Sequence, residues 1–433
     1  MRHLPLILML LAALTGCQRP PMTVPGVFAS GKIDPLADVP EAERTNAVTL
    51  FFATDRVYDE SKNDWRQYTR LRSSGLDLGT IEIAFGPDDA WPSIVAATRG
   101  RPGGERHRPR IEQIDRLGKL ARTTIAQPNV KPAPTNEPIP PSPDAFVSQL
   151  NQALERSAGK DITVYIHGFK VGFAQGALTA AEYDLYTGGL GPFILYSWPS
   201  YNSLFEYSHD RDSVRYTTAH ARQFFEFLAD QINAGKLDAE TIHVLAHSTG
   251  AEVIGSVLRE LALMSRELTP DQRRAKWRIG SVLLIAPDIS VDVARERVLK
   301  EDLRGMYEQI VVYSSLHDRA LDWAARVLYR TARLGSVRED DFSEQDRYWL
   351  SQAADVALID SDSAPYHGFV NHSHHRFSPA VSSDVILCLR SSLGPAQRGL
   401  VREPGQVLWR FADDYPQRAT EAARRVYGPP AQP

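Results

Sequence analysis

The sequence predicts an α/β fold, in which one mostly parallel β-sheet carries helices on both of its faces. Two observations support this prediction. From about residue 144 onward, short apolar runs alternate with longer segments that have the periodicity of helices. The short runs are rich in β-branched residues and apolar almost throughout, as is typical of strands buried on both sides of a parallel sheet. We therefore expect functional residues just beyond the strands, because parallel sheets place their sites at the carboxyl ends.

Strand-like and helix-like segments follow one another in a regular order. Residues 47–56 and 78–87 predict two strands that open the folded part of the chain. Six further segments contain a predicted strand: 161–169, 193–200, 241–250, 281–290, 309–320 and 355–361. Helices are predicted at 144–157, 174–186, 214–235, 251–264 and 293–305.

The composition is that of an ordinary globular protein. Of the 433 residues, 43% are hydrophobic and 24% are charged. The net charge of −4 gives no reason to expect binding to nucleic acid. The two cysteines, Cys17 and Cys388, provide no disulfide framework, and the apolar run VILCL predicts that Cys388 is a buried, inert thiol.

The first 17 residues, MRHLPLILMLLAALTGC, have the shape of an export signal. A basic start precedes a short apolar core, which is too short for a comfortable transmembrane helix. The last four residues resemble a bacterial lipobox, in which the cysteine becomes the lipid-modified first residue of the mature chain. We therefore expect acyl chains such as palmitate on Cys17 to attach the protein to a membrane. Gln18 resembles an outer-membrane sorting residue, so the predicted location is the periplasmic face of the outer membrane in a bacterial cell envelope.

The remaining chain predicts one large domain with a segment on either side. Residues 18–44 are polar and contain proline, which predicts a tether to the membrane. The domain itself is expected to span residues 45–395. Within it, residues 100–143 are rich in glycine and proline, and we interpret them as an extended surface insertion. Residues 396–433 form a predicted C-terminal extension.

The stretch TIHVLAHSTGAEVI at 241–254 places Ser248 between a buried strand and a helix. A residue at so tight a corner stands above the sheet, with the N-terminus of the next helix beneath it, and this position suits a nucleophile. Ala246 stands where the usual G-x-S-x-G elbow has its first glycine. The alternative interpretation is a serine that caps the helix.

A nucleophilic serine needs a base, and the base needs an acidic partner that holds its tautomer. On α/β sheets these residues follow in the order Ser, then Asp or Glu, then His. The next two strand ends supply Asp288 and Asp318; the acid usually lies two strands after the nucleophile, so Asp318 is preferred and Asp288 is the alternative. The loop after the last strand offers four candidate bases, among which spacing alone does not choose: His367, His372, His374 and His375.

Acyl transfer also needs hydrogen-bond donors that face the developing oxyanion. The amide of Thr249, directly after the predicted nucleophile, is one candidate. The loop after the strand at 161–169 supplies the other, because Gly168 permits a close approach and Phe169 or Lys170 offers an amide. A metal site built from the histidine cluster is a competing interpretation, but no carboxylate or cysteine completes an obvious ligand spacing, and we expect neither metal nor cofactor.

Six motifs in one order resemble a known family. They are ATDR at 53–56, VYIHGFKVGF at 164–173, YSWPSYNSLFEYSHDRDS at 196–213, AHSTGAEV at 246–253, IAPDIS at 285–290 and VYSSLHDRAL at 312–321. Together they resemble a bacterial family with the α/β-hydrolase fold, long catalogued as a domain of unknown function and often carrying lipoprotein signals. The resemblance covers roughly residues 47–390. It implies Ser248 as nucleophile and Asp318 as acid, and the context Asn371-His372-Ser373-His374 favours His372 as base.

These observations predict a membrane-tethered serine hydrolase that cleaves a small-molecule or lipid ester through an acyl-enzyme. One alternative is an acyltransferase or peptidase that uses the same triad. Another is a non-catalytic envelope protein that keeps the fold in order to bind a partner.

Overall fold

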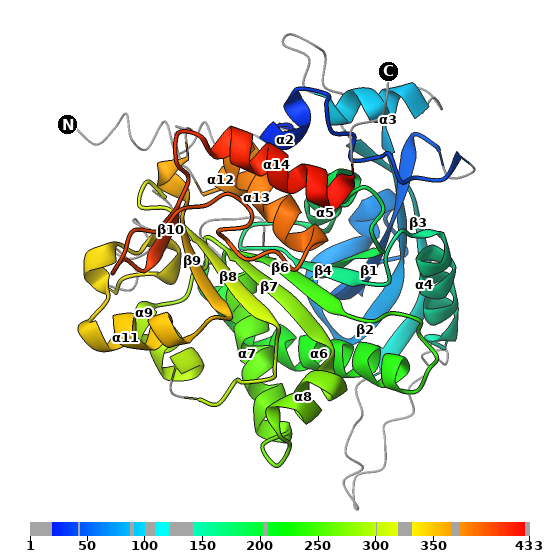
Figure 1. The fold of residues 1–433 in the computed structure, drawn as a ribbon. Coiled ribbons are helices and arrows are strands. Elements are labelled where there is room, and N and C mark those ends of the chain that lie inside the picture. The colour runs from blue at the N-terminus through cyan, green and yellow to red at the C-terminus, as the bar shows by residue number, and fades with distance from the viewer. Residues whose placement is uncertain are drawn as a thin grey trace, which may run out of the picture.

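A ten-stranded β-sheet lies at the centre of the part of the chain that the structure describes (Figure 1). The structure is a computed structural model, and it describes residues 20–41, 44–86, 91–99, 109–121, 142–201, 207–299, 301–318, 331–364 and 372–428. Across the sheet the strands follow the order β10-β9-β8-β7-β6-β4-β5-β1-β2-β3. Neighbouring strands are parallel from β10 to β1, whereas β2 is antiparallel to both β1 and β3. The prediction of an α/β fold with a mostly parallel sheet is therefore confirmed.

The strands in chain order are β1 (Ala47–Tyr58), β2 (Tyr68–Phe85), β3 (Pro109–Ala121), β4 (Ile162–Ile166), β5 (Phe193–Ser197), β6 (Ile242–His247), β7 (Ile279–Ile285), β8 (Gln309–Ser314), β9 (Val356–Asp360) and β10 (Leu408–Arg410). Every residue of β4, β5, β6 and β7 is buried, as their continuous apolar runs require. After β4 the chain adds β5 on one side and later β6 on the other, so the strand order reverses around β4. In open α/β sheets such a reversal opens a crevice for ligands at the carboxyl ends.

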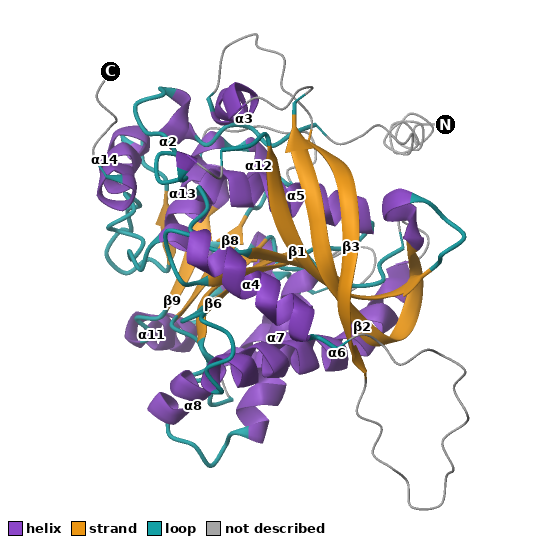
Figure 2. Cartoon of the chain, turned by 90° about the vertical axis from the view of Figure 1, so that its right-hand side faces the viewer, coloured by secondary structure: helices purple, strands orange, loops and turns teal. Residues whose placement is uncertain are grey.

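Helices cover both faces of the sheet (Figures 1 and 2). One apolar core includes residues of α2 (Gly26–Ala29), α5 (Phe173–Thr187), α13 (Pro379–Arg390) and α14 (Tyr415–Tyr427). The core on the opposite face includes residues of α4 (Asp144–Arg156), α6 (Tyr207–Asn233), α7 (Gly250–Met264) and α8 (Pro270–Trp277). The other α-helices within the described ranges are α3 (Trp91–Thr98), α9 (Val291–Ala294), α11 (Glu344–Gln352) and α12 (His374–Phe377).

Residues 20–36, here called the N-terminal strap, are packed onto the domain and do not form the predicted tether. Val27 and Phe28 are 2% and 0% exposed. The ring of Phe28 stacks on Tyr186 and meets Tyr427 edge-on, so it is held between α5 and α14. The tether prediction is wrong for these residues, because apolar side chains that look isolated in the sequence find partners on distant helices.

The predicted C-terminal extension is also part of the domain. Strand β10 pairs in parallel with β9, and α14 contacts α13 and α2 (Figure 1, red helix). The guanidinium of Arg398 donates to Asp384 on α13 over 2.8 and 3.2 Å, and both side chains are fully buried. The domain therefore continues to residue 428, and the boundary predicted at residue 395 is wrong.

The predicted surface insertion at 100–143 contains strand β3. This strand pairs antiparallel with β2 at the edge of the sheet, with two shifts of register. The insertion prediction is wrong for residues 109–121, because the segment PRIEQIDRLGKLA carries only one glycine, Gly118, and one proline, at its first position, unlike its glycine-rich and proline-rich flanks. Those flanks, 100–108 and 122–141, lie outside the described residues.

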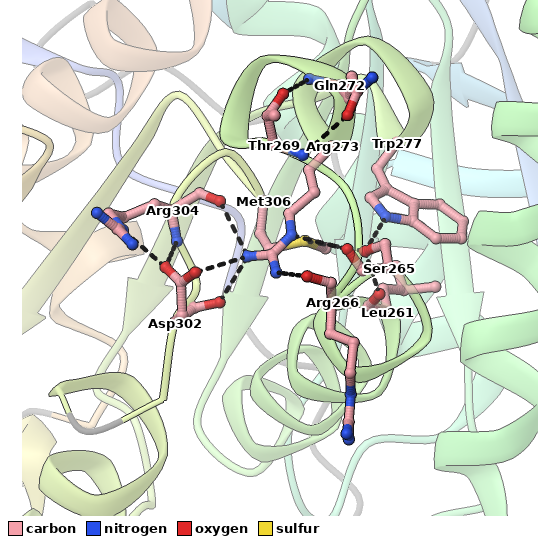
Figure 3. Close-up of polar contacts among 10 residues, drawn as sticks. All are labelled: Leu261, Ser265, Arg266, Thr269, Gln272, Arg273, Trp277, Asp302, Arg304 and Met306. Atoms are coloured by element: carbon pink, nitrogen blue, oxygen red, sulfur yellow. Dashed lines mark hydrogen bonds and ion pairs between the residues drawn. The ribbon is translucent and has the colours of Figure 1, made fainter.

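Helix α7, which follows the predicted nucleophile, is fixed at its far end by a buried arginine. Arg273 on α8 donates from Nε to the Ser265 carbonyl over 3.0 Å and from Nη1 to the Asp302 carbonyl over 2.9 Å (Figure 3). The indole of Trp277 donates to Ser265 Oγ over 3.1 Å. These bonds join the end of α7 to the loop before β8 and so hold the helix in place against the sheet.

The predicted signal peptide, Cys17 and Gln18 lie outside the described residues. Within the described ranges, no helix combines the length and the apolar character that crossing a bilayer requires.

Candidate active site

Ser248 occupies a strained corner between β6 and α7. Its φ angle is 53°, which is unfavourable for a residue that has a Cβ atom. The Ser248 amide donates to the Ile285 carbonyl over 2.8 Å, which fixes the corner to the end of the neighbouring strand β7. The apolar strand and the amphipathic helix on either side leave only Ser248 and Thr249 to make the turn. The local geometry is therefore that of a nucleophile elbow.

His372 lies between Ser248 and Asp318. Its Nε2 atom is 2.9 Å from Ser248 Oγ, and its Nδ1 atom is 2.7 Å from Asp318 Oδ2. An ionised carboxylate can only accept a hydrogen bond, so Nδ1 carries the proton and Nε2 presents a lone pair to the serine hydroxyl. The structure thus brings together the three residues that the sequence singled out, in the arrangement that a Ser-His-Asp triad requires.

Asp288, the alternative acid, has a different partner. Arg333 Nε donates to Asp288 Oδ1 over 2.7 Å, and Arg333 Nη2 donates to the Asp288 carbonyl over 3.2 Å. Both side chains are buried, at 4% and 5% exposure. The ion pair joins the loop after β7 to the segment before α11, so we assign Asp288 a structural role.

The other candidate bases are not placed like His372. His374 and His375 are buried in α12, and the ring of His375 lies 4.6 Å from that of His247. Burial, together with the neighbouring histidines and Arg376, lowers the pKa of His375 well below its ordinary value. His367 lies outside the described residues. Among the residues that the structure describes, no group of three or more His, Cys, Asp or Glu side chains is arranged to hold a metal ion.

The loop after β4 packs directly against the elbow. A Cβ atom on Gly168 would lie 2.8 Å from Ser248 Cβ and 2.9 Å from His247 Nδ1, so only glycine allows this approach. Thr249 is the N-cap residue of α7 and is almost completely buried. The backbone amides of Thr249 and Phe169 remain the predicted donors to the oxyanion. The amide of Lys170 donates to Ser200 Oγ over 2.9 Å, so it is already engaged, and we withdraw Lys170 from the predicted donors.

The comparison with protein families agrees with this geometry. The family described as "Alpha/beta hydrolase of unknown function (DUF900)" matches residues 142–390, which is more than half of the chain. The chain belongs to this α/β-hydrolase family. The resemblance seen in the sequence is thereby confirmed, although the matched region begins after β1–β3 rather than near residue 47. A search of curated proteins finds no match.

Two residues of this α/β-hydrolase hold the predicted base and the predicted acid in position, and the sequence did not assign them this role. His247 Nε2 is 3.0 Å from the carbonyl oxygen of His372, to which it donates, so it holds the backbone of the predicted base. Asp362, just after β9, accepts from Ser315 Oγ over 2.6 Å and from the backbone amide of His317 over 3.2 Å. It thereby shapes the turn that ends at Asp318. The sequence signals for these two residues were their positions alone. His247 directly precedes Ser248, and Asp362 closely follows a strand.

A buried arginine from the ATDR motif braces the loops beneath the site. Arg56, at the carboxyl-end half of β1, donates to Ser197 Oγ over 2.9 Å and to the Val171 carbonyl over 3.0 Å. It also contacts His167 Nε2 at 3.4 Å. These bonds join the loop after β4 to the last residue of β5. Burial is the main reason that the pKa of Arg56 falls to about 10, while Asp55 and Asp210 oppose this shift.

The imidazole of His167 contacts Arg56 in this group of bonds and is neutral. Its Nδ1 donates to the Gly168 carbonyl over 2.9 Å, and its ring stacks on Trp198, whose indole donates to the His167 carbonyl over 2.7 Å. Burial and then the charge of Arg56 lower the pKa of His167 to about 3. The residue therefore orders the loop and does not serve as a base.

Proposed function

We propose that this protein is a serine hydrolase with esterase-like activity, and that Ser248, His372 and Asp318 form its catalytic triad. The observation that carries the proposal is the bridging position of His372, with 2.9 Å to Ser248 Oγ and 2.7 Å to Asp318 Oδ2. The fold, the strained elbow and the family support a hydrolase. An ester is the proposed bond because the reaction needs only a serine, a base and oxyanion donors.

The proposed reaction proceeds through an acyl-enzyme. Ser248 Oγ attacks the carbonyl carbon of the ester while His372 Nε2 takes the hydroxyl proton, and Asp318 stabilises the imidazolium. The amides of Thr249 and Phe169 donate to the oxyanion. When the tetrahedral intermediate collapses, His372 gives the proton to the departing alkoxide, which leaves as an alcohol. Water then loses a proton to His372 and attacks the acyl group, which leaves as a carboxylic acid while the proton returns to Ser248.

We further propose that the protein is anchored by lipid on Cys17 at the periplasmic face of the outer membrane. The support for this location is the sequence alone: the export signal, the Leu-Thr-Gly-Cys motif and Gln18. Mass spectrometry of the purified N-terminus tests it, because an acylated Cys17 as first residue is expected and an unmodified or retained signal peptide contradicts it.

A fluorophosphonate probe and a soluble short-chain ester test the catalytic proposal. Wild type is expected to be labelled at Ser248 and to hydrolyse the ester. Ser248→Ala, His372→Ala and Asp318→Asn should each lower kcat/KM by about 10⁴-fold or more. Asp340→Asn is the matched control for Asp318→Asn, because it makes the same substitution at an exposed carboxylate away from the site. It should keep the wild-type rate.

Three outcomes count against parts of the proposal. Folded wild-type protein that neither reacts with the probe nor hydrolyses any ester points to a non-catalytic binding role, especially if Ser248→Ala complements a deletion. Labelling that survives His372→Ala but not His374→Ala moves the base by two residues. Transfer of the acyl group to an added amine or alcohol faster than to water identifies an acyltransferase.

A further inference from the structure

The N-terminal strap is bonded to the helix that follows the proposed base. The amide of Met22 donates to Glu182 Oε1 over 2.6 Å, and the amide of Thr23 donates to the Arg376 carbonyl over 2.8 Å. The guanidinium of Arg376 donates in turn to the Pro20 carbonyl over 3.2 Å and to Glu182 Oε2 over 2.6 Å. The chain is therefore held against α12 from Pro20 onward.

The bonds that hold the strap are shielded from water. The side chains of Glu182 and Arg376 are 5% and 6% exposed, so their ion pair is not one that solvent readily screens. Further along the strap, the Val27 amide donates to Ser383 Oγ on α13 over 3.2 Å. The strap is thus bonded to helices α5, α12 and α13. The strap cannot leave the domain without exposing its apolar residues to water.

The strap brings the N-terminus close to the catalytic centre. Arg376 follows His372 by four residues, and consecutive Cα atoms are about 3.8 Å apart, so their Cα atoms lie within about 15 Å of each other. Pro20 lies within reach of the Arg376 side chain, which donates to the Pro20 carbonyl. The start of the strap and the proposed base therefore belong to the same side of the domain.

The proposed lipid anchor lies only three residues before Pro20. Three extended residues span at most about 11 Å, and acyl chains in the hydrocarbon hold their cysteine at the bilayer surface. A flexible tether of about 27 residues would instead have a mean reach of about 30 Å and would leave the domain free to turn. The docking of the strap removes that freedom.

We propose that the side of the domain formed by the start of the strap and α12 lies against the bilayer, and that the enzyme takes as substrate an ester whose acyl chain lies in that membrane. This inference rests on the proposed function and on lipidation of Cys17. The partner that we propose for this surface is the interface of a lipid bilayer. The anchor then serves to orient the catalytic side toward a lipid ester as well as to retain the protein.

Fluorescence quenching tests the orientation without any need for catalysis. Full-length lipidated protein carries a fluorophore at Phe377→Cys on α12 or at exposed Lys236→Cys, which precedes β6 at the amino edge of the sheet. The native Cys388 is fully buried and should not compete for the label. In vesicles of phosphatidylethanolamine and phosphatidylglycerol with a headgroup-labelled quencher lipid, the label at 377 should be quenched at least twofold more than the label at 236. Equal quenching, or failure of the protein to bind the vesicles, overturns the proposal.

A linker insertion tests the substrate class. A Gly/Ser insertion of about twenty residues between Gln18 and Arg19 frees the domain to turn. It should lower hydrolysis of a long-chain fluorogenic ester embedded in the same vesicles about fivefold or more and leave a soluble short-chain ester unaffected. The same peptide inserted after Gly235, in an exposed turn, is the control and should change neither rate. An unchanged rate on the embedded ester overturns this inference, whereas absence of hydrolysis of either ester by wild type overturns the proposed function, and the quenching result then stands by itself.

Discussion

Replacement of Gly168 by alanine adds a single methyl group, and this group should push the loop after β4 away from the Ser248 elbow. The added Cβ would lie 2.8 Å from Ser248 Cβ, 2.9 Å from His247 Nδ1 and 3.0 Å from the His247 carbonyl. Non-bonded carbon atoms prefer separations of about 3.5–4.0 Å, so the loop and the elbow must part by roughly 1 Å. Overpacking of this kind costs about 1–3 kcal/mol of stability.

The loss of activity should exceed the loss of stability. A displacement of about 1 Å between a nucleophile and the groups that serve its transition state costs on the order of 100-fold in rate. We therefore expect Gly168→Ala to lower kcat/KM on a soluble ester about 100-fold, and to slow labelling by a fluorophosphonate comparably. Urea unfolding followed by circular dichroism should show that the variant is still folded.

Gly172→Ala is the matched control on the same loop. Gly172 has φ −80°, which alanine adopts freely, and a Cβ there would meet no atom within 4 Å. This variant should lose at most about 1 kcal/mol of stability at the start of α5 and keep its activity. If Gly168→Ala retained more than about a third of the kcat/KM of Gly172→Ala, the contact between the loop and the elbow would not be what sets the catalytic geometry.

Two further predictions concern buried ionisable side chains. Because the folded state holds the pKa of His167 near 3, the unfolded chain binds a proton between about pH 6.5 and 3 that the folded protein excludes, and stability is lost as pH falls through this window. From pH 7 to 5 this group should account for about 2 kcal/mol, so His167→Gln should show a correspondingly smaller change in unfolding free energy; an identical pH dependence would contradict the assignment. Arg398→Met should lower the unfolding free energy by about 3–5 kcal/mol because it leaves the carboxylate of Asp384 buried without its ion partner, and adding Asp384→Leu should recover part of the loss. A change below about 1 kcal/mol in urea unfolding would show that residues after 395 are not part of the cooperative domain.

The fold and the positions of Ser248 and Asp318 just beyond strands were predictable because their signals are local. Ser248 is marked by an apolar strand before it and an amphipathic helix behind it, within 14 residues of sequence. Asp318 follows a strand in the same way. The choice of His372 needed the family resemblance, since four histidines occupy one short stretch and periodicity says nothing about which ring faces the serine.

The errors arose where a segment depends on distant partners. Val27 and Phe28 stand between prolines and polar residues, so no periodic pattern marks them. Their burial depends on α13 and α14, which lie more than 350 residues later in the chain. Strand β3 is an edge strand whose pairing exists only through β2. Local propensity carries little information about such segments, because tertiary contacts supply most of their stability.

The residues that hold the proposed triad in place share a property that explains why the sequence did not reveal them. His247, Asp362 and Arg56 are polar side chains whose partners are mostly backbone groups of other loops: the carbonyls of His372 and Val171, and the amide of His317. A backbone partner leaves no trace in residue identity, so neither composition nor spacing points to the pair. Yet each bond fixes a loop that carries a proposed catalytic group, and those loops follow three different strands, β4, β8 and β9. The precision of the site must therefore come from these contacts, since the strands position the loops only at their starting points.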